Sequence, residues 1–339
     1  MKPNKARPPV PARDGVTPSR VWCPRGPWRT LDEFLLERFP YVSPDVMRDR
    51  LARGDILDDE GRAQQAGSHY QPDRWLWYFR MVPHESPVPF EMPVLHADER
   101  LIAVDKPHFL ATTPGGRYLQ ETALTRVRRH FGEDGITPLH RLDRETAGVL
   151  LFCRDPALRG AYQSLFQHGC VDKEYEAVAP FLDLPSHGHT HVSRMEDVPG
   201  LFVMREVTGE PNSRTDVLRQ HDWEDAQGRR LAVYRLRPHS GRKHQLRLHM
   251  SSLGAPILND VFYPDLLPPR EDDDFDQPLQ LLARHISFVD PVTGQTVRFS
   301  SRRRLAEGPC SSWCERPCGS AVGYDCSGRR MDFLAGKCP

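Results

Sequence analysis

One stretch of the sequence, residues 138–155 (PLHRLDRETAGVLLFCRD), places four charged side chains directly before an apolar run. The run 149–152 (VLLF) lies between Gly148 and the segment 154–156 (RDP), which is typical of a buried strand. The fold must therefore hold Asp143, which has an arginine on either side, at the edge of its core. Positive neighbours favour the ionised carboxylate, which could act as a nucleophile or a base. The alternative is a purely structural turn at the surface, held by ion pairs.

The order of residues in this stretch resembles the H-R-L-D-x-x-T-S-G-L-L-L motif of the RluA family of pseudouridine synthases. Ala147 stands where serine is usual in the motif, a change between two small residues. The motif is long and irregular, so that chance agreement is improbable. The matching residues are His140, Arg141, Leu142, Asp143, Thr146, Gly148, Leu150 and Leu151.

Four further segments resemble family segments in the expected order, so that the resemblance covers about 94–304. They are 101–107 (LIAVDKP), 171–178 (VDKEYEAV), 239–263 (HSGRKHQLRLHMSSLGAPILNDVFY) and 281–300 (LLARHISFVDPVTGQTVRFS). These segments depart from the family pattern where Lys243 replaces threonine, Asn259 replaces glycine and Asp290 replaces histidine. Arg284 and His285 also stand in a slightly different pattern.

The sequence predicts an α+β fold, because expected strands and helices are mixed without a regular βαβ repeat. The resemblance implies the pseudouridine synthase catalytic fold, a mixed and mostly antiparallel central sheet flanked by helices and loops. It is joined to a small N-terminal α+β domain. Residues 30–39 and 43–54 are the expected helices of that domain, with a capping-box pattern at Thr30 and Glu33 and a helix start at Ser43.

The resemblance also implies the chemistry, which is to break the glycosidic bond of a uridine, turn the base and rejoin it through carbon. Asp143 would be the nucleophile or base, and whether it attacks the sugar or takes a sugar proton stays open. Arg247 is expected to pair with Asp143 and keep it ionised and aimed. Tyr175 would stack on the uracil and could act as a general base late in the reaction.

A uridine inside structured RNA must be flipped out to be reached, and Arg141 is the side chain that the resemblance places in the vacated space. Phosphate and base contacts are expected from a further group of residues around the site. No cofactor and no metal are implied. The further RNA-binding residues are His140, Arg144, Arg242, Lys243, His244 and Gln245.

Composition shifts divide the chain into five parts. We expect a disordered basic, proline-rich arm over 1–20, a small domain over 21–80, a proline-rich linker over 81–93, the catalytic domain over 94–305 and a cysteine-containing tail over 306–339. The small domain resembles an S4 domain, an RNA-binding module with two short helices and a hairpin. The alternative is any small α+β cap domain.

We expect a cytoplasmic, monomeric protein, and the family resemblance implies RNA as its partner. The formal net charge is zero, but the segment 236–249 holds four Arg or Lys and three His without an acid, a stripe that suits an anion. No apolar run approaches the ~20 residues that span a bilayer. The N-terminus lacks the apolar region of a signal peptide, and so no membrane partner is expected.

Two groups of potential metal ligands are not expected to bind a metal ion. His187, His189 and His191 alternate like metal ligands, but no cysteine or carboxylate lies near them in sequence, which favours a solvated loop. Five cysteines between Cys310 and Cys338 lack C-x-x-C spacing, so that we expect a disordered tail, with zinc or redox chemistry as the alternatives.

Two classes of function remain, an RNA-modifying enzyme and a non-catalytic RNA-binding protein with the same fold. The presence of Asp143, Tyr175 and Arg247 together favours the enzyme. The S4-like domain favours ribosomal RNA as the target, with tRNA as the alternative.

Overall fold

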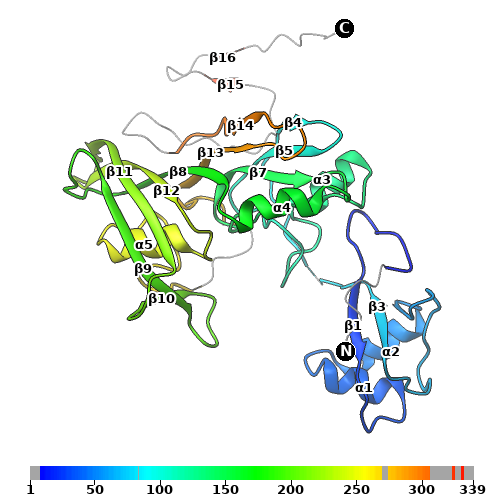
Figure 1. Cartoon of the computed structure of the whole chain (residues 1–339). Helices are drawn as coiled ribbons and strands as arrows, with labels where there is room; N and C mark the ends of the chain where they lie inside the picture. Colours follow the sequence, from blue (N-terminus) through cyan, green and yellow to red (C-terminus); the bar gives the residue numbers. More distant parts are fainter. Residues whose placement is uncertain (1–7, 83, 269–273, 306–322, 325–329, 332–339) are drawn as a thin grey trace.

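A computed structural model describes residues 8–82, 84–268 and 274–305 together with two short strands, β15 (Gly323–Tyr324) and β16 (Arg330–Met331), which pair antiparallel. The expectations for residues 1–7 and for the remainder of the cysteine-containing tail lie outside the described residues. The described chain forms a small N-terminal unit and a larger unit built on one sheet (Figure 1).

The N-terminal unit has the two expected helices and a three-stranded antiparallel sheet, in which a further strand is added to the expected hairpin. Its elements are β1 (Ser19–Cys23), α1 (Leu31–Arg38), α2 (Pro44–Ala52), β2 (Ile56–Leu57) and β3 (Arg74–Tyr78), with strand order β1-β3-β2. Both helices begin where the capping residues predict: the Thr30 hydroxyl accepts a hydrogen bond from the Glu33 amide, and the Ser43 hydroxyl accepts one from Val46. The apolar faces of both helices pack on the sheet around Phe34, Met47 and Leu51.

Residues 8–20, for which we expected disorder, make specific contacts. Val16 is buried, and the Arg128 guanidinium and the carbonyl of Gly15 lie at hydrogen-bond distance. The Ala12 amide donates to Asp134, and β1 already begins at Ser19. Basic and proline-rich composition predicts an arm without a core of its own, but a neighbouring helix supplies the partners here.

The larger unit is built on an 11-stranded sheet whose main path runs β10-β9-β11-β12-β8-β13-β7-β5-β4, with β14 paired to β13 and β6 to β7. Among the described strand pairs, β13 and β7 run parallel and the others antiparallel, which confirms the predicted mixed, mostly antiparallel sheet. The strands are β4 (Val94–Ala97), β5 (Leu101–Lys106), β6 (Thr137–Pro138), β7 (Ala147–Cys153), β8 (Val171–Pro180), β9 (His189–Asp197), β10 (Met204–Val207), β11 (Ser213–Glu224), β12 (Arg230–Pro238), β13 (Leu281–Val289) and β14 (Thr296–Ser300).

Three helices accompany this sheet: α3 (Ala123–Phe131), α4 (Arg159–Gln167) and α5 (Gln245–Ser252). Helix α3 packs with β5 and β7 in one core, whereas α5 packs with β8, β11 and β12 in another. Tyr175 on β8 borders both cores. The centre of the sheet therefore lies between two hydrophobic clusters. Loops that begin or end at the centre of the sheet can be held rigidly by this packing.

The described residues of the segment 81–93, which are 81, 82 and 84–93, form no helix or strand, yet they are attached to the larger unit. Val88 and Phe90 are buried in the core of α3 and β5. The Arg126 guanidinium donates to the carbonyls of both residues, and the Val88 amide donates to Glu121. The apolar residues between the prolines thus attach this segment to the larger unit.

Candidate active site

Asp143 lies in the loop that precedes β7, and buried side chains from other segments fix the backbone of this loop. The Lys106 ammonium donates to the carbonyl of Arg144 at 3.2 Å and also to those of Pro107 and Leu110. The Thr112 hydroxyl donates to the carbonyl of Leu142 at 2.7 Å and accepts from its amide at 3.1 Å. The residues on both sides of Asp143 are therefore anchored, so that its carboxylate is held in position.

Gly148 allows β7 to approach β13 directly behind this loop. Its φ is +112°, and a Cβ atom there would lie 2.2 Å from the carbonyl oxygen of Ala283, with which it pairs in the parallel β7–β13 register. A side chain at this position would force the two strands apart. The glycine of the motif thus serves the close contact of two central strands.

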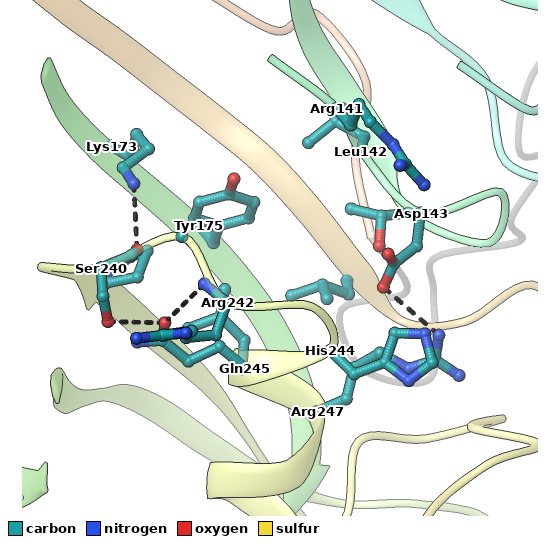
Figure 2. A pocket seen from close by; sticks show the side chains of 15 residues that line it. Arg141, Leu142, Asp143, Lys173, Tyr175, Ser240, Arg242, His244, Gln245 and Arg247 are labelled. Carbon is teal, nitrogen blue, oxygen red and sulfur yellow. Dashed lines mark hydrogen bonds and ion pairs between the residues drawn. The ribbon is translucent and has the colours of Figure 1, made fainter. Parts of the chain in front are cut away.

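Arg247 on α5 lies beside Asp143 in the pocket (Figure 2). It also contacts a second, buried carboxylate, that of Asp260. Its Nη1 lies 3.4 Å from Oδ2 of Asp143, while its Nε and Nη2 lie 2.8 Å and 2.5 Å from the two oxygens of Asp260. Burial opposes the charged form of Arg247, but the hydrogen bond and charge of Asp260, followed by Asp143, raise its pKa overall. The guanidinium is a permanent cation aimed at Asp143.

Tyr175 projects from the middle of β8 into the same pocket (Figure 2). Its neighbours in the sheet are Leu236 on β12 and Ala283 on β13, so that the ring position is set by two strand registers. Burial, with a smaller effect of the Asp143 charge, raises the pKa of Tyr175. Its phenol is therefore protonated at neutral pH, and a flat, apolar ring faces the pocket.

Two hollows meet at Asp143 and Arg247. The first is lined by Tyr175, Thr146, Lys173 and Leu281 and by the loop 238–242. The second is lined by residues 111–118 together with Phe202 and Phe262, and it shares Arg141, Asp143 and Arg247 with the first. The carboxylate is thus reachable from both hollows, which suits a substrate longer than one nucleotide.

Three of the expected RNA-binding residues are used in holding the site together. The His140 Nε2 accepts a hydrogen bond from the Leu151 amide, and its ring stacks on Phe166. Arg144 pairs with Glu145, and its guanidinium lies 5.0 Å from the centre of the Tyr118 ring.

Gln245 is buried, and both ends of its amide are occupied. Its Nε2 donates to the Arg214 carbonyl and the Thr215 hydroxyl, while its Oε1 accepts from Ser240 and the Arg242 amide. The sequence could not reveal this, because residue identity does not tell which polar atoms the fold itself consumes.

The other expected RNA-binding residues border the hollows. Arg141 and Arg242 are exposed, and Lys243 is half-buried, with its ammonium near Asp197 and 4.2 Å from the centre of the Phe202 ring. His244 is buried, and its Nδ1 lies 3.1 Å from the Tyr263 hydroxyl, whereas its Nε2 has no hydrogen-bond partner among the described residues. Burial lowers the pKa of His244 to about 4, and the ring is therefore neutral at pH 7.

The expectation for the histidine-rich segment was wrong in two respects. His189 and His191 lie on strand β9 rather than in a solvated loop. A carboxylate does complete the group, because Glu206 on β10 lies 2.8 Å from the Nε2 of His191. Glu206 is 15 residues away in sequence, and strands β9 to β11 were not expected, so that sequence spacing could not predict this contact.

Within the part of the chain that the structure describes, every helix is too short or too polar to cross a lipid bilayer.

Comparison with known proteins identifies related sequences. Residues 100–252 match the sequence model of the family described as RNA pseudouridylate synthase. A protein of Vibrio cholerae named dual-specificity RNA pseudouridine synthase RluA is 30% identical over 201 residues, which are 58% of this chain and 77% of that protein. An uncharacterized RNA pseudouridine synthase of Synechocystis is 29% identical over 239 residues, 68% of this chain and 78% of its own length.

A solved structure shares the fold. The structure of human RNA pseudouridylate synthase domain containing 1 superimposes with a TM-score of 0.52 at 22% sequence identity, covering 65% of this chain and 86% of the human one. The predicted pseudouridine synthase fold is thereby confirmed.

Proposed function

This chain belongs to the RluA family of RNA pseudouridine synthases, and from that membership we propose that it isomerises specific uridines of structured ribosomal RNA, with Asp143 as the reacting carboxylate. As an RNA pseudouridine synthase it is an isomerase. The observation that carries the assignment of residues is the meeting of Asp143, Arg247 and Tyr175 in one pocket. A non-catalytic RNA-binding protein would have no need to keep a buried cation aimed at a carboxylate.

Asp143 acts at the junction of ribose and base. The bond between N1 of uracil and C1′ of ribose breaks, the base turns, and a bond from C5 to C1′ forms while the C5 proton leaves and N1 takes up a proton. Atoms and electrons balance within the nucleotide, so that no cofactor is needed. Asp143 either attacks the sugar or takes a sugar proton, and in both roles its carboxylate acts beside the Arg247 guanidinium, whose Nη1 lies 3.4 Å away.

Tyr175 supports the base while it turns. A flat ring that borders two hydrophobic cores gives the detached uracil an apolar surface on which to stack. Because its phenol is protonated, Tyr175 can take up the C5 proton as a general base only if it passes its own proton on in the same step.

Arg141 enters the RNA helix, and the remaining exposed cations hold the phosphates. Arg141 has no hydrogen bond or ion pair within the described chain, is exposed and lies at the junction of both hollows, which suits a side chain that replaces the flipped base. Arg242 and Lys243 lie beside the pocket and suit phosphate contacts. His244 presents an unpaired Nε2 that suits a hydrogen bond with the substrate.

Ribosomal RNA is favoured over tRNA because of the N-terminal unit. We propose the division into an S4-like RNA-binding domain over 21–80 and a catalytic domain over 94–305, acting as a monomer in the cytoplasm. The three-stranded sheet with two capped helices is compatible with this assignment. tRNA stays the alternative substrate, and the Vibrio cholerae relative is named a dual-specificity enzyme.

The test maps pseudouridines across the transcriptome in cells that lack the gene and are complemented with the natural protein, with Asp143→Ala or with Asp172→Ala. Asp172 is an exposed residue of β8 and serves as the matched control. We expect one or a few ribosomal sites to vanish without the gene, to return with the natural protein and Asp172→Ala, and to stay absent with Asp143→Ala.

RNA binding of Asp143→Ala should remain close to that of the natural protein in a filter-binding assay. Isomerisation retained by Asp143→Ala would refute the assignment of the reacting group. A vanished site in tRNA instead of ribosomal RNA would refute the preferred substrate while leaving the chemistry intact.

A further inference from the structure

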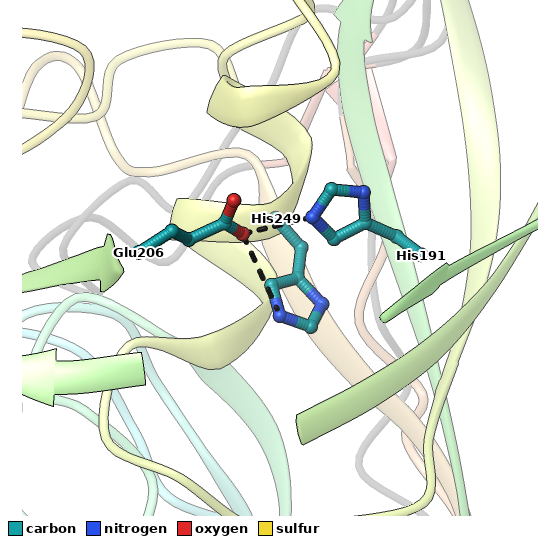
Figure 3. Close-up of side chains that lie close together, drawn as sticks. All are labelled: His191, Glu206 and His249. Atoms are coloured by element: carbon teal, nitrogen blue, oxygen red, sulfur yellow. Dashed lines mark hydrogen bonds and ion pairs between the residues drawn. The ribbon is translucent and has the colours of Figure 1, made fainter. Parts of the chain in front are cut away.

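Three side chains of types that can bind a metal ion converge outside the catalytic pocket (Figure 3). They come from three separate elements and not from one sequence motif. His191 comes from β9, Glu206 from β10 and His249 from α5. The Nε2 of His191 lies 2.8 Å from Oε1 of Glu206, and the Nε2 of His249 lies 3.9 Å from the same oxygen. The three donor atoms all lie within 4.8 Å of one another.

The imidazole of His249 is already oriented as in a metal ligand. Its Nδ1 lies 2.9 Å from the Thr215 hydroxyl, which can accept a hydrogen bond from Nδ1 and so leave the lone pair on Nε2, the atom that faces Glu206. The Ser193 and Ser213 hydroxyls lie 3.1 Å and 3.0 Å from Nε2. The β9–β11 register brings these three hydroxyl groups together around the His249 ring, since it sets Ser213 beside Ser193 and Thr215 beside His191.

We propose that His191, Glu206 and His249 bind a divalent transition-metal ion, with zinc the best fit. Two imidazoles and one carboxylate are a zinc donor set that leaves a fourth position for water. Zinc bonds of about 2.0–2.2 Å in a tetrahedral site separate neighbouring donors by about 3.3–3.5 Å. The distances of 2.8 Å and 3.9 Å lie on either side of that value, so that small side-chain rotations bring the donors into place.

Burial favours an ion over three independent surface groups. The His249 side chain is fully buried, and those of His191 and Glu206 are 17% and 25% exposed. Zinc would neutralise the partly buried carboxylate and use both imidazole lone pairs, while the fourth position stays accessible from the partly exposed side. The alternative is a metal-free network in which His191 and Glu206 form a hydrogen-bonded pair.

A metal ion here would act beyond the proposed isomerisation, by fastening the β9–β10 hairpin to α5. The loop of this hairpin carries Phe202, which lines the second hollow and lies 5.3 Å, centre to centre, from the His244 ring. Helix α5 carries Arg247 on another face. The ion would therefore join a wall of the RNA-binding hollow to the helix that holds the catalytic ion pair.

The experiment uses the full-length protein after dialysis against a chelator. Zn²⁺ is titrated by calorimetry, and Co²⁺ is added to a second sample so that its absorption spectrum reports the ligands. The variants are His191→Gln and Glu206→Gln, and the matched control is His189→Gln. His189 lies two residues before His191 on the same strand, with ring centres 6.3 Å apart, but it is outside the cluster.

We expect the natural protein and His189→Gln to bind Zn²⁺ alike, and His191→Gln and Glu206→Gln each to lose about 100-fold in affinity, since loss of even an outer-shell partner costs 10–100-fold. The site-dependent Co²⁺ spectrum should lack thiolate charge-transfer absorption, which separates this site from cysteine-bound cobalt. Zinc should also raise the melting temperature of the natural protein but not that of His191→Gln.

Two results would overturn the proposal. One is Zn²⁺ binding that is unchanged in both His191→Gln and Glu206→Gln. The other is the absence of any Zn²⁺ binding or Co²⁺ spectrum that depends on these two residues, which would leave the metal-free network as the role of the cluster. Because both variants replace side chains by amides of similar size, near-ultraviolet circular dichroism can verify that the fold is retained.

Discussion

Arg247 is bound more closely to Asp260 than to Asp143. Two of its nitrogens lie 2.8 Å and 2.5 Å from the Asp260 carboxylate, whereas the third lies 3.4 Å from Asp143. The side chains of Arg247 and Asp260 are almost completely buried, while that of Asp143 is 32% exposed. Asp260 therefore fixes the direction of the guanidinium, and the more accessible Asp143 carboxylate keeps lone pairs for the substrate.

The first prediction concerns Asp260→Asn. Removing this charge leaves Arg247 buried without its main partner, and breaking a buried ion pair in this way costs about 3–5 kcal/mol. We expect the free energy of unfolding, measured by urea denaturation, to fall by that amount. Asp45→Asn is the control, because Asp45 forms an exposed pair with Arg48 and its loss should leave stability unchanged within error.

Turnover should also decrease in Asp260→Asn. The guanidinium is then free to turn fully towards Asp143 and to occupy the carboxylate lone pairs that the substrate needs. Single-turnover assays at a temperature where the variant is folded separate this effect from instability. Full activity at normal stability would contradict the orienting role of Asp260.

The sequence allowed the candidate catalytic residues to be named, but not the interactions that hold them. The motif around Asp143 and the segments of Tyr175 and Arg247 indicated which residues meet, and the structure brings them into one pocket. No pattern indicated that Lys106 and Thr112 anchor the Asp143 loop, because their partners are backbone carbonyls, which carry no sequence signature.

The sequence also did not show which polar residues of the same motifs the fold itself uses. Gln245 is buried with its amide fully used within the protein. Hydrogen-bond partners depend on the three-dimensional neighbourhood, so that a polar residue in a motif can serve the fold as well as the substrate. The same reason explains why Glu206 could not be connected with His191 before strands β9 and β10 were known.

Tyr175→Phe separates the two roles of this residue. The variant keeps the ring that supports the uracil and removes the hydroxyl that would relay the C5 proton. We expect RNA affinity and stability to stay near those of the natural protein and the single-turnover rate to fall about 100-fold, within the usual range for a lost general base. Tyr175→Leu, which removes the ring as well, should be slower still. An unchanged rate in Tyr175→Phe would restrict the residue to stacking.

Arg141→Ala tests the insertion of Arg141 into the RNA. If Arg141 fills the space of the flipped base, its loss should slow the reaction on a structured target about 100-fold, because unstacking costs a few kcal/mol. The rate on an unstructured strand with the same uridine should change little. Arg242→Ala is the contrast, since loss of a phosphate contact should weaken binding to both RNAs. It should also reduce the slope of the logarithm of the binding constant against the logarithm of salt concentration by about one. Equal losses on both RNAs in Arg141→Ala would contradict the insertion.

Acid should destabilise the protein through a histidine buried behind the Asp143 loop. His108 is buried, and its Nδ1 lies 2.6 Å from the Glu145 carbonyl, to which it donates. Burial lowers the pKa of His108 to about 3, whereas an unfolded histidine titrates near 6.5. Above pH 6.5 the ring is neutral in both states, and below it the unfolded chain binds a proton that the folded one does not.

The contribution of His108 to stability is therefore complete above about pH 6.5 and is lost as the pH falls towards 3, by up to ~1.4 kcal/mol per pH unit. Urea unfolding at a series of pH values measures this slope. His108→Asn retains a donor for the Glu145 carbonyl but cannot take up the proton, so that its stability should fall less steeply over this window. His187→Asn, at an exposed position, should keep the slope of the natural protein. Parallel curves for His108→Asn and the natural protein would show that His108 does not titrate on unfolding.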